Sequence, residues 1–311
     1  MKQKTLLFVF ALLSAMTASA KTFPTLINGI YYYFNTSMKQ ARVTSGGNKY
    51  TGKVTIPATV TYDGVTYSVT SIEAYAFSGC SGLTSIEIPN SVTAIGSSAF
   101  TGCSGLTSVT IPNSVTTIGM EAFYGCSGLT SVTIPNSVTT IEYHAFRDCS
   151  SLTSIIIPNS VTSIGVNAFY GCSGLTSVTI PNSVTSIGLH AFSDCSSLTS
   201  VTCEAISVPT TGGSAFSDVP LGSATLYVPA SALDAYKTAE QWSEFGTIAA
   251  IPDGGIRGDV NGDGVVNGTD IQAIINAIVE GEYDEKADVN EDEQVNGTDI
   301  QEVINIIVNA D

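Results

Sequence analysis

A repeat of 23 residues limits what this chain can fold into more than any other feature of its sequence. From Ser68 the same pattern returns six times and ends at Ala205. The unit from Ser91 to Asn113, SVTAIGSSAFTGCSGLTSVTIPN, is typical. A single unit is too short to bury its own apolar side chains, whereas stacked units bury them as continuous columns. The repeat therefore predicts a solenoid over residues 68–205.

Each unit contains a stretch in which polar and apolar residues alternate, such as Ser108-Val109-Thr110-Ile111. A period of two residues indicates a half-buried β-strand, and the Pro112-Asn113 pair that follows indicates a turn. Equivalent strands of neighbouring units should pair in parallel, ~4.8 Å apart. We expect the Ala-Phe-x-x-Cys segment to form the opposite wall as a short helical or irregular turn.

The segments that flank the repeat should cap the open ends of the stack, which would otherwise expose strand edges and core. Residues 21–67 are the predicted N-terminal cap, where Gly52 to Pro57 matches the strand of a unit. Residues 206–251 are a degenerate repeat and C-terminal cap, where Leu226 to Pro229 again matches a strand. Within this cap, residues 231–245 are predicted to be helical and to close the core with Leu233, Tyr236 and Trp242.

The motif IPxSVxxIGxxAFxxCxxL resembles the leucine-rich repeats of BspA-type surface proteins, over about Asn28 to Ile251. This resemblance implies an exported bacterial protein, and several members of the family are adhesins. A host protein or a glycan is the expected partner of the solenoid. One candidate surface is its strand face, a Ser/Thr ladder interrupted by Glu87 and Ile156.

The N-terminus has the pattern of a secretory signal peptide over residues 1–20. Lys2 and Lys4 precede an apolar run from Leu6 to Leu13, and Ala18-Ser19-Ala20 follows as a small-residue cleavage site. The alternative is a transmembrane anchor, but the apolar run is too short to span a ~30 Å hydrocarbon core. We therefore expect a secreted or cell-surface bacterial protein with no membrane span.

Six of the seven cysteines share one repeat position, which forms a column along the stack: Cys80, Cys103, Cys126, Cys149, Cys172 and Cys195. The strand spacing alone permits disulfides, but parallel Cβ vectors suit a disulfide torsion poorly. Buried thiols acting as small apolar side chains are the favoured interpretation. Cys203 is expected to face inward too.

No catalytic constellation is present in the sequence, and an enzyme is not expected. The two histidines, His144 and His190, lie two units apart, roughly 10 Å at the strand spacing, which is too far to share a metal ion. No basic patch points to nucleic acid.

Units differ mainly around the Ala-Phe pair, where the side chains encode ligand recognition or reflect drift at an unconstrained surface. The variable positions are Met120, Glu121, Tyr124, Tyr143, His144, Arg147, Val166, Asn167, Tyr170, Leu189, His190 and Ser193.

The net charge of −16 is concentrated near the C-terminus, because residues 253–311 hold 15 acids and two bases. Within this region, residues 252–257 are a predicted linker and residues 258–311 a second domain. Oxygen side chains recur there with the spacing of a 12-residue EF-hand calcium loop. The first loop comprises Asp259, Asn261, Asp263, Val265 through its backbone carbonyl, Asn267 and Asp270. The second comprises Asp288, Asn290, Asp292, Gln294 through its backbone carbonyl, Asn296 and Asp299.

The second loop has Glu293 at the sixth position, where the first has Gly264. A left-handed backbone costs a residue with a side chain about 1 kcal/mol, so the second site is expected to bind calcium more weakly. Each loop is followed by apolar residues at helical spacing: Ile271, Ile274, Ile275 and Ile278 after the first, and Ile300, Val303, Ile304 and Ile307 after the second.

Two calcium loops, each followed by one helix, resemble a type I dockerin over Gly258 to Asp311. This resemblance implies a small all-α domain that binds a cohesin domain of a scaffold protein. The family's contact positions fall on Gly268, Thr269, Ile275, Asn276, Gly297, Thr298, Ile304 and Asn305. Many dockerins have Ser-Thr at the first pair and a basic residue in the second, so the cohesin recognised here is expected to differ.

Together these features predict a secreted, non-catalytic binding protein: a leucine-rich-repeat solenoid docked through calcium and a dockerin to a scaffold. Two alternatives remain open. One is a free-standing adhesin with a stabilising calcium module, and the other is a hydrolytic component of a polysaccharide-degrading complex.

Overall fold

The computed structural model describes residues 23–47, 49–251, 258–261, 266–281, 286–290, 292 and 294–309. The predicted signal peptide (1–20) and linker (252–257) lie outside these residues. So do Asp263, Val265 and Glu293 of the predicted calcium loops. None of the described helices is both long and apolar enough to cross a membrane.

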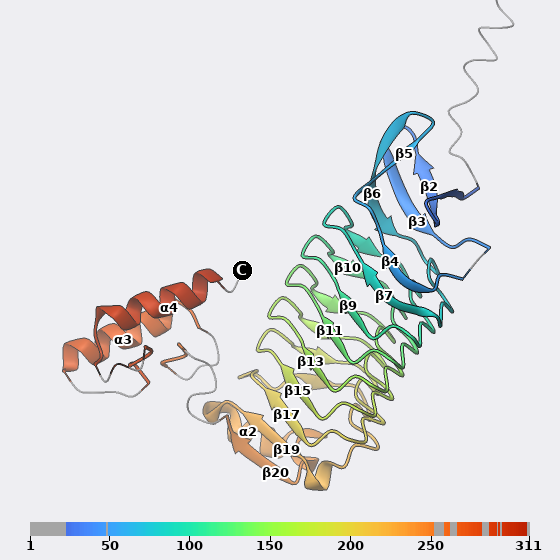
Figure 1. The fold of residues 1–311 in the computed structure, drawn as a ribbon. Helices are drawn as coiled ribbons and strands as arrows, with labels where there is room; N and C mark the ends of the chain where they lie inside the picture. The colour runs from blue at the N-terminus through green and yellow to red at the C-terminus, as the bar shows by residue number, and fades with distance from the viewer. Residues whose placement is uncertain are drawn as a thin grey trace, which may run out of the picture.

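A nine-stranded parallel sheet runs the length of the solenoid, one strand per turn of the chain (Figure 1). Its strands are β4 (Gly52–Thr55), β7 (Leu83–Glu87), β9 (Ser108–Thr110), β11 (Ser131–Thr133), β13 (Ser154–Ile156), β15 (Ser177–Ile180), β17 (Ser200–Cys203), β19 (Thr225–Val228) and β20 (Thr247–Ala250). The strands of successive units pair in register, as Val109 with Val132. The predicted parallel solenoid is confirmed.

Each unit also carries a second, two-residue strand that the sequence analysis did not predict. These strands are β8 (Ala94–Ile95), β10 (Thr117–Ile118), β12 (Thr140–Ile141), β14 (Ser163–Ile164), β16 (Ser186–Ile187) and β18 (Thr210–Thr211). They pair in parallel within two sheets, β8 with β10 in the first, as Thr117 with Ala94, and β12, β14, β16 and β18 in the second. A second β ladder thus joins neighbouring units along the solenoid, with one break between β10 and β12.

The Ala-Phe-x-x-Cys segment is an irregular turn that forms a third ladder between units. The amide of Phe100 donates to the carbonyl of Ala122 at 2.8 Å, and the amide of Phe123 donates to Ala145 at 2.8 Å. Within a unit, the Cys103 amide donates to the Phe100 carbonyl at 3.1 Å. The backbone on this side is thus satisfied by the neighbouring unit, which makes every unit depend on the next.

The interior is built from columns of identical side chains. The phenylalanines of the Ala-Phe pairs stack with nearly parallel rings, with centroids 5.1 Å apart for Phe77 and Phe100 and 5.5 Å apart for Phe146 and Phe169. The cysteine column lies beside them, and all seven cysteines are free, buried thiols. The Cys149 thiol donates to the Phe123 carbonyl of the preceding unit at 3.2 Å. The prediction of buried thiols is confirmed.

The N-terminal cap consists largely of antiparallel hairpins. Strands β1 (Thr25–Ile27), β2 (Ile30–Asn35) and β3 (Gln40–Thr44) form one meander. Strand β5 (Thr59–Tyr62) forms a hairpin with β6 (Val65–Ile72), which joins the cap to β8 of the first units. The predicted strand at Gly52 to Pro57 is present as β4, paired in parallel with β7.

The C-terminal cap is less helical than predicted. Residues 231–245 form a 3-10 turn at Ala230–Ala232, the short helix α2 (Leu233–Thr238) and a second 3-10 turn at Trp242–Glu244. Gln241, with φ of 65°, interrupts the helical path. Tyr236 and Trp242 are buried and Leu233 is partly buried against the core, as expected. Strand β20, which was not predicted, forms the final edge of the long sheet.

The C-terminal region contains two helices, α3 (Gly268–Glu280) and α4 (Gly297–Asn309). Its core is small, with Val260, Ile274, Ala287, Val289 and Val303 buried. Both helices follow a predicted calcium loop, and the expected arrangement of loop, helix, loop and helix is therefore present. The described residues of this C-terminal region thus form a small all-α unit.

Candidate functional site

The two predicted calcium loops run into their helices through the same side-chain cap. The amide of Thr269 donates to Asn267 Oδ1 at 2.8 Å, and the amide of Thr298 donates to Asn296 Oδ1 at 2.9 Å. Asparagine at this position satisfies an amide that the helix itself cannot pair. The two identical VNGTDIQ segments thus fold alike.

The last acid of each loop, Asp270 or Asp299, is fully buried and holds the loop together. Asp270 Oδ1 accepts from the amides of Val260 and Asn261, at 2.9 and 3.1 Å, while Oδ2 accepts from the Asn267 amide at 2.8 Å. Asp299 repeats this pattern, accepting from the Asn290 amide at 3.2 Å and the Asn296 amide at 2.8 Å. Each carboxylate therefore joins the start of its loop to the start of its helix.

The remaining described oxygens of the second loop converge on the same short segment. Asp288 Oδ1 accepts from the Asp292 amide at 3.0 Å, and Asn290 Nδ2 donates to Asp292 Oδ2 at 3.1 Å. The Gln294 amide donates to Asp292 Oδ1 at 3.0 Å. In the first loop, Asn261 Nδ2 donates to Thr269 Oγ1 at 2.7 Å, and Asn290 and Thr298 form the equivalent bond at 2.8 Å.

The donor set fits a hard divalent cation, because carboxylate and amide oxygens are the ligands that calcium prefers. Across the described residues, however, no three His, Cys, Asp or Glu side chains lie together as they would around a metal ion. In the described conformation the loop oxygens accept backbone and side-chain N–H groups instead. Calcium binding would exchange some of these hydrogen bonds for coordination.

The eight residues predicted to contact a partner are all exposed: Gly268, Thr269, Ile275, Asn276, Gly297, Thr298, Ile304 and Asn305. The match between the two helices extends to the exposed fraction, which is 37% for Ile275 and 36% for Ile304. Gln272 Nε2 donates to Asn276 Oδ1 at 3.0 Å, and Gln301 and Asn305 form the equivalent bond at 3.1 Å. Two equivalent surfaces are therefore present.

The apolar stripes after the loops divide between core and surface. Ile274 and Val303 are fully buried, and Ile271, Ile300 and Ile307 pack partly against this core. Ile275 and Ile304 face outward, and so does Ile278, which is 39% exposed. Helical spacing alone predicts one continuous buried stripe, but two short helices are too few to cover it.

The variable residues of the solenoid lie on its turn face with unusual backbone geometry. The residue directly before each Ala-Phe pair has a left-handed backbone, with φ of 58° at both Glu121 and His144. Arg147 lies between two tyrosines, its guanidinium carbon 5.7 Å from the Tyr124 ring centroid and 4.6 Å from that of Tyr170. Successive members of this trio are 23 residues apart, which is the length of the repeat. The repeat therefore contains the information that they are neighbours, although the sequence analysis did not predict their stacking.

Each histidine contacts a polar side chain of the turn face. His144 Nε2 lies 3.4 Å from Asn167 Nδ2, and His190 Nδ1 lies 3.1 Å from Ser193 Oγ.

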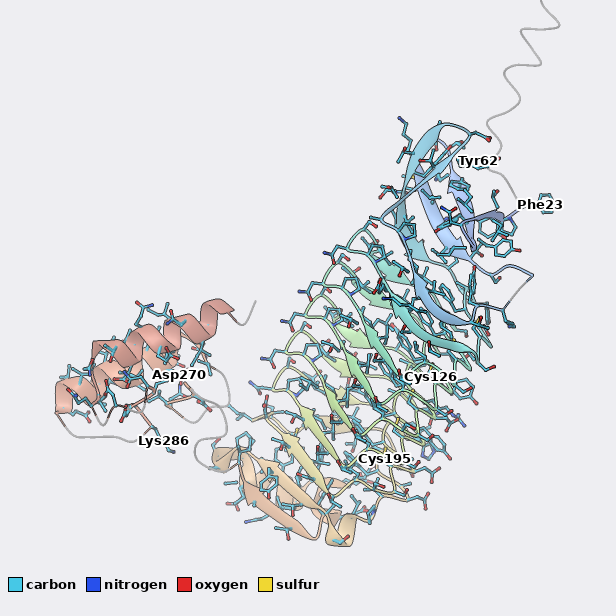
Figure 2. The ribbon with its side chains drawn as sticks, in the orientation of Figure 1. Phe23, Tyr62, Cys126, Cys195, Asp270 and Lys286 are labelled. Atoms are coloured by element: carbon cyan, nitrogen blue, oxygen red, sulfur yellow. The ribbon has the colours of Figure 1, made fainter. Side chains whose placement is uncertain are left out.

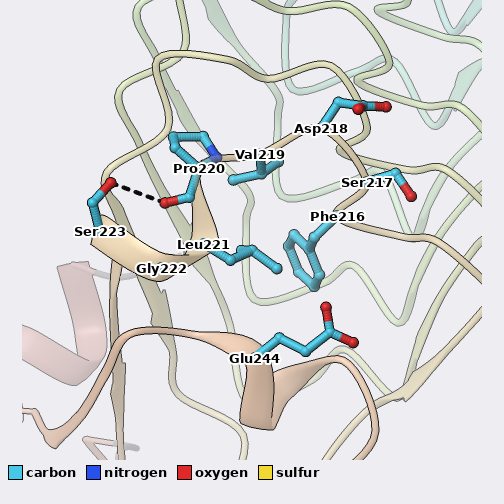
Figure 3. A pocket seen from close by; sticks show the side chains of 9 residues that line it. All are labelled: Phe216, Ser217, Asp218, Val219, Pro220, Leu221, Gly222, Ser223 and Glu244. Atoms are coloured by element: carbon cyan, nitrogen blue, oxygen red, sulfur yellow. Dashed lines mark hydrogen bonds between the residues drawn. The ribbon is translucent and has the colours of Figure 1, made fainter.

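A hollow of about 520 Å³ in the C-terminal cap has Asp218 and Glu244 among its lining residues (Figure 3). Its one described side-chain hydrogen bond runs from Ser223 Oγ to the Pro220 carbonyl at 3.0 Å. Among the described contacts of this hollow, no hydrogen bond joins Ser217 or Ser223 to Asp218 or Glu244, so no serine is paired with a base there.

The solenoid and its 23-residue repeat define a class of bacterial repeat protein, and a comparison with protein families identifies that class. The family model described as BspA type leucine rich repeat region matches six copies over residues 60–173 and 116–236. The chain belongs to this family. It also carries a type I dockerin domain, whose family model matches residues 257–308. No match was found among the curated proteins.

Two solved bacterial structures share the solenoid. A leucine-rich repeat protein of T. pallidum has a TM-score of 0.53 and 28% identity, covering 61% of this chain and 86% of its own. A leucine-rich repeat protein of Bacteroides ovatus has a TM-score of 0.50 and 24% identity, covering 74% of this chain and 77% of its own. The second similarity supports the fold alone.

Proposed function

We propose that this chain is a secreted, non-catalytic binding protein of the bacterial surface. Its dockerin docks it to a cohesin-bearing scaffold in a calcium-dependent way, and its solenoid binds a host protein or glycan. The observation that carries the docking proposal is the pair of equivalent exposed surfaces on α3 and α4. A dockerin match over residues 257–308 supports the same partner.

Calcium would be held by the oxygens of the two loops and would set α3 and α4 in place. In the first loop the ligands proposed are Asp259, Asn261, Asp263, Val265 (backbone), Asn267 and Asp270. In the second they are Asp288, Asn290, Asp292, Gln294 (backbone), Asn296 and Asp299. The second loop is proposed as the weaker site because Glu293 replaces glycine there.

The near-identity of the two surfaces supports binding in two orientations related by a half-turn. One orientation would use Thr269 and Ile275, and the other Thr298 and Ile304. Gly268 and Gly297 leave open space around the position a Cβ would take. A cohesin that fits this surface would therefore press closely against the start of each helix.

A capture experiment tests the docking proposal. A panel of immobilised cohesins is incubated with the full-length chain in calcium or in EDTA, and retained protein is measured. We expect capture by at least one cohesin in calcium and none in EDTA. Thr269→Ala with Ile275→Ala, or Thr298→Ala with Ile304→Ala, should each leave binding, and both pairs together should abolish it.

Val279→Ala provides a matched control, because Val279 is an exposed apolar residue of α3 outside the proposed contact set. It should bind as the unaltered chain does. Loss of capture from one pair alone would contradict the two orientations. If no cohesin captured the chain, a free-standing adhesin with a stabilising calcium module would replace the docking proposal, and hydrolysis of a polysaccharide panel would argue for the enzymatic alternative.

A further inference from the structure

A second hollow, of about 370 Å³, lies in the N-terminal cap between the β1–β2 hairpin and β4. Its size falls in the ~300–1,000 Å³ range of small-molecule sites. Its lining combines two lysines, two tyrosines and several small polar residues. The full lining is Leu26, Asn28, Gly29, Ile30, Tyr31, Lys49, Tyr50, Thr51, Lys53, Val54 and Thr55.

Hydrogen bonds and packing fix the two tyrosines of this hollow. Tyr50 is buried, and its hydroxyl accepts from the Tyr31 amide at 3.1 Å and donates to the Thr44 carbonyl at 3.3 Å. The Tyr31 ring lies directly against Gly46, where an added Cβ would fall within 1.9 Å of ring atoms. The aromatic part of the wall is thus preorganised, which reduces the entropy cost of binding.

The ammonium group of each lysine contacts a residue of the first repeat unit, Ser78 or Glu87. Lys49 Nζ donates to the Ser78 carbonyl, a neutral partner that leaves its charge uncompensated. Lys53 Nζ pairs with Glu87, whose other oxygen accepts from Thr55 Oγ1 at 2.7 Å. The Glu87 carboxylate compensates the charge of Lys53, whereas Lys49 has no such partner among the described residues. The hollow keeps one excess positive charge.

The charge distribution of the chain sets this cap apart. Residues 23–67 contain Lys39, Arg42, Lys49 and Lys53 against the single acid Asp63, a net charge of +3. Residues 68–251 contain eleven acids and two bases, a net charge of −9. An anionic ligand is therefore repelled along most of the solenoid and attracted at this end.

We propose that this hollow binds an anionic sugar residue of an acidic polysaccharide. The lysine ammonium groups would hold the negative group, as compact charges with rotatable N–H donors do. The half-buried Tyr31 ring would contact the apolar face of the sugar, and Asn28 and the threonines would meet its hydroxyls. A carboxylate and a sulfate ester share this chemistry. The inference names the ligand class of the solenoid and so rests on the binding part of the proposed function, but not on docking.

Titration calorimetry with the full-length chain tests this inference. The probes are oligogalacturonate, which carries carboxylates, a chondroitin sulfate oligosaccharide, which carries sulfates too, and a neutral galactan oligosaccharide. We expect an acidic probe to bind and the neutral one not to bind. Binding of oligogalacturonate assigns the group as a carboxylate, whereas binding of the sulfated probe alone assigns it as a sulfate ester.

Lys49→Gln combined with Lys53→Gln should weaken binding of the acidic probe about tenfold or more, because it removes two charged donors. Lys39→Gln is the matched control: it removes an exposed lysine of the same cap that does not line the hollow, and it should bind nearly as the unaltered chain does. Unchanged circular dichroism and melting temperature of each variant show that the cap is folded.

Equal weakening by Lys39→Gln would overturn the proposal, since the cap would then attract anions without a defined site. Failure of both acidic probes to bind would overturn it as well. Calcium-dependent cohesin capture is measured on the same protein samples. If capture persists while no acidic sugar binds, the sugar inference alone fails; if sugar binding persists without capture, the docking proposal alone fails.

Discussion

The solenoid and the C-terminal dockerin domain, called the module below, are stabilised by opposite means. In the solenoid, columns of phenylalanine, leucine and cysteine are buried, and backbone hydrogen bonds connect each unit to the next. Cys126 and Cys195 of the cysteine column are labelled in Figure 2. Among the described residues of the module, five form the buried core. Its most buried polar groups, Asp270 and Asp299, accept hydrogen bonds from loop amides.

The two regions obtain their stability from different sources. The solenoid gains its free energy of folding from apolar burial between neighbours, which needs no ligand. A region of about 50 residues with a small core generally needs a metal or another cross-link. A cation bound by the Asp and Asn oxygens of its loops would supply such a cross-link. We therefore expect the two regions to respond independently to chemical change.

Calcium removal should have the largest effect and should distinguish the two regions most clearly. EDTA should abolish hydrogen-exchange protection in α3 and α4, because the loops lose the cation that links their oxygens. Protection in β9, β11 and β13 should stay as it was. Hydrogen exchange of the full-length chain measures both regions at once, and readdition of calcium provides the control. Full protection of the helices in EDTA would contradict the predicted role of calcium.

Phe146→Ala should destabilise the solenoid and leave the C-terminal module unaffected. Phe146 is fully buried between Phe123 and Phe169, and its truncation should lower the free energy of unfolding by about 3–5 kcal/mol. Chemical denaturation followed by circular dichroism measures the loss. Ile156→Ala is the control in the same unit, because Ile156 is 77% exposed and should change stability little. Similar losses in both variants would argue against a stacked core.

The sequence determined the repeating part of the fold well and its local geometry poorly. The Ser108 to Thr110 alternation identified the long sheet, and identical units fixed its register. The two-residue strand Thr117–Ile118 is too short to show a period, so it was missed. Left-handed backbone at Glu121 and His144 was also missed, because neither residue type requires it.

For the candidate site, spacing predicted the calcium ligands and the partner residues, and comparison with known proteins confirms a dockerin domain over residues 257–308. The exposure of Ile275, Ile278 and Ile304 depends on how α3 packs against α4. The sequence of one helix does not determine that packing. The lysine-lined hollow was not predicted, since Lys49 and Tyr31 are brought together by tertiary contacts.

The cysteine column should make the solenoid sensitive to alkali. Burial raises the pKa of the Cys149 thiol from its ordinary value of 9.0 to about 12. A raised folded-state pKa means that this stability is complete below pH 9, and that it falls as pH rises from 9 toward 12. Each such thiol should then remove about 1.4 kcal/mol per pH unit.

Denaturation at several pH values from 8 to about 10.5 measures this slope over the window in which the thiol ionises only when unfolded. Cys149→Ala should reduce the slope by about 1.4 kcal/mol per pH unit relative to the unaltered chain. An unchanged slope would show that Cys149 is not protonated and buried as described. The calcium module contains no cysteine, so its stability should lack this thiol contribution.

Arg147→Ala should have the smallest effect. Its stacking between Tyr124 and Tyr170 is partly exposed, and an exposed cation–π contact contributes about 0.5–1 kcal/mol. Arg147→Lys keeps the charge but loses the planar group, so its loss of stability should be intermediate. Thermal melts of the three proteins rank them. A loss as large as that of Phe146→Ala would place Arg147 among the residues that hold the units together.

The backbone hydrogen bonds between units allow the number of units to change while both caps stay the same. A duplicated 23-residue unit would present the same donors and acceptors to both neighbours. It would therefore insert without leaving an unsatisfied edge, and would lengthen the stack by ~4.8 Å along its sheet. Gene duplication within the repeat could thus act as a ruler, adjusting the reach between a ligand held at the first cap and the anchoring domain beyond the last.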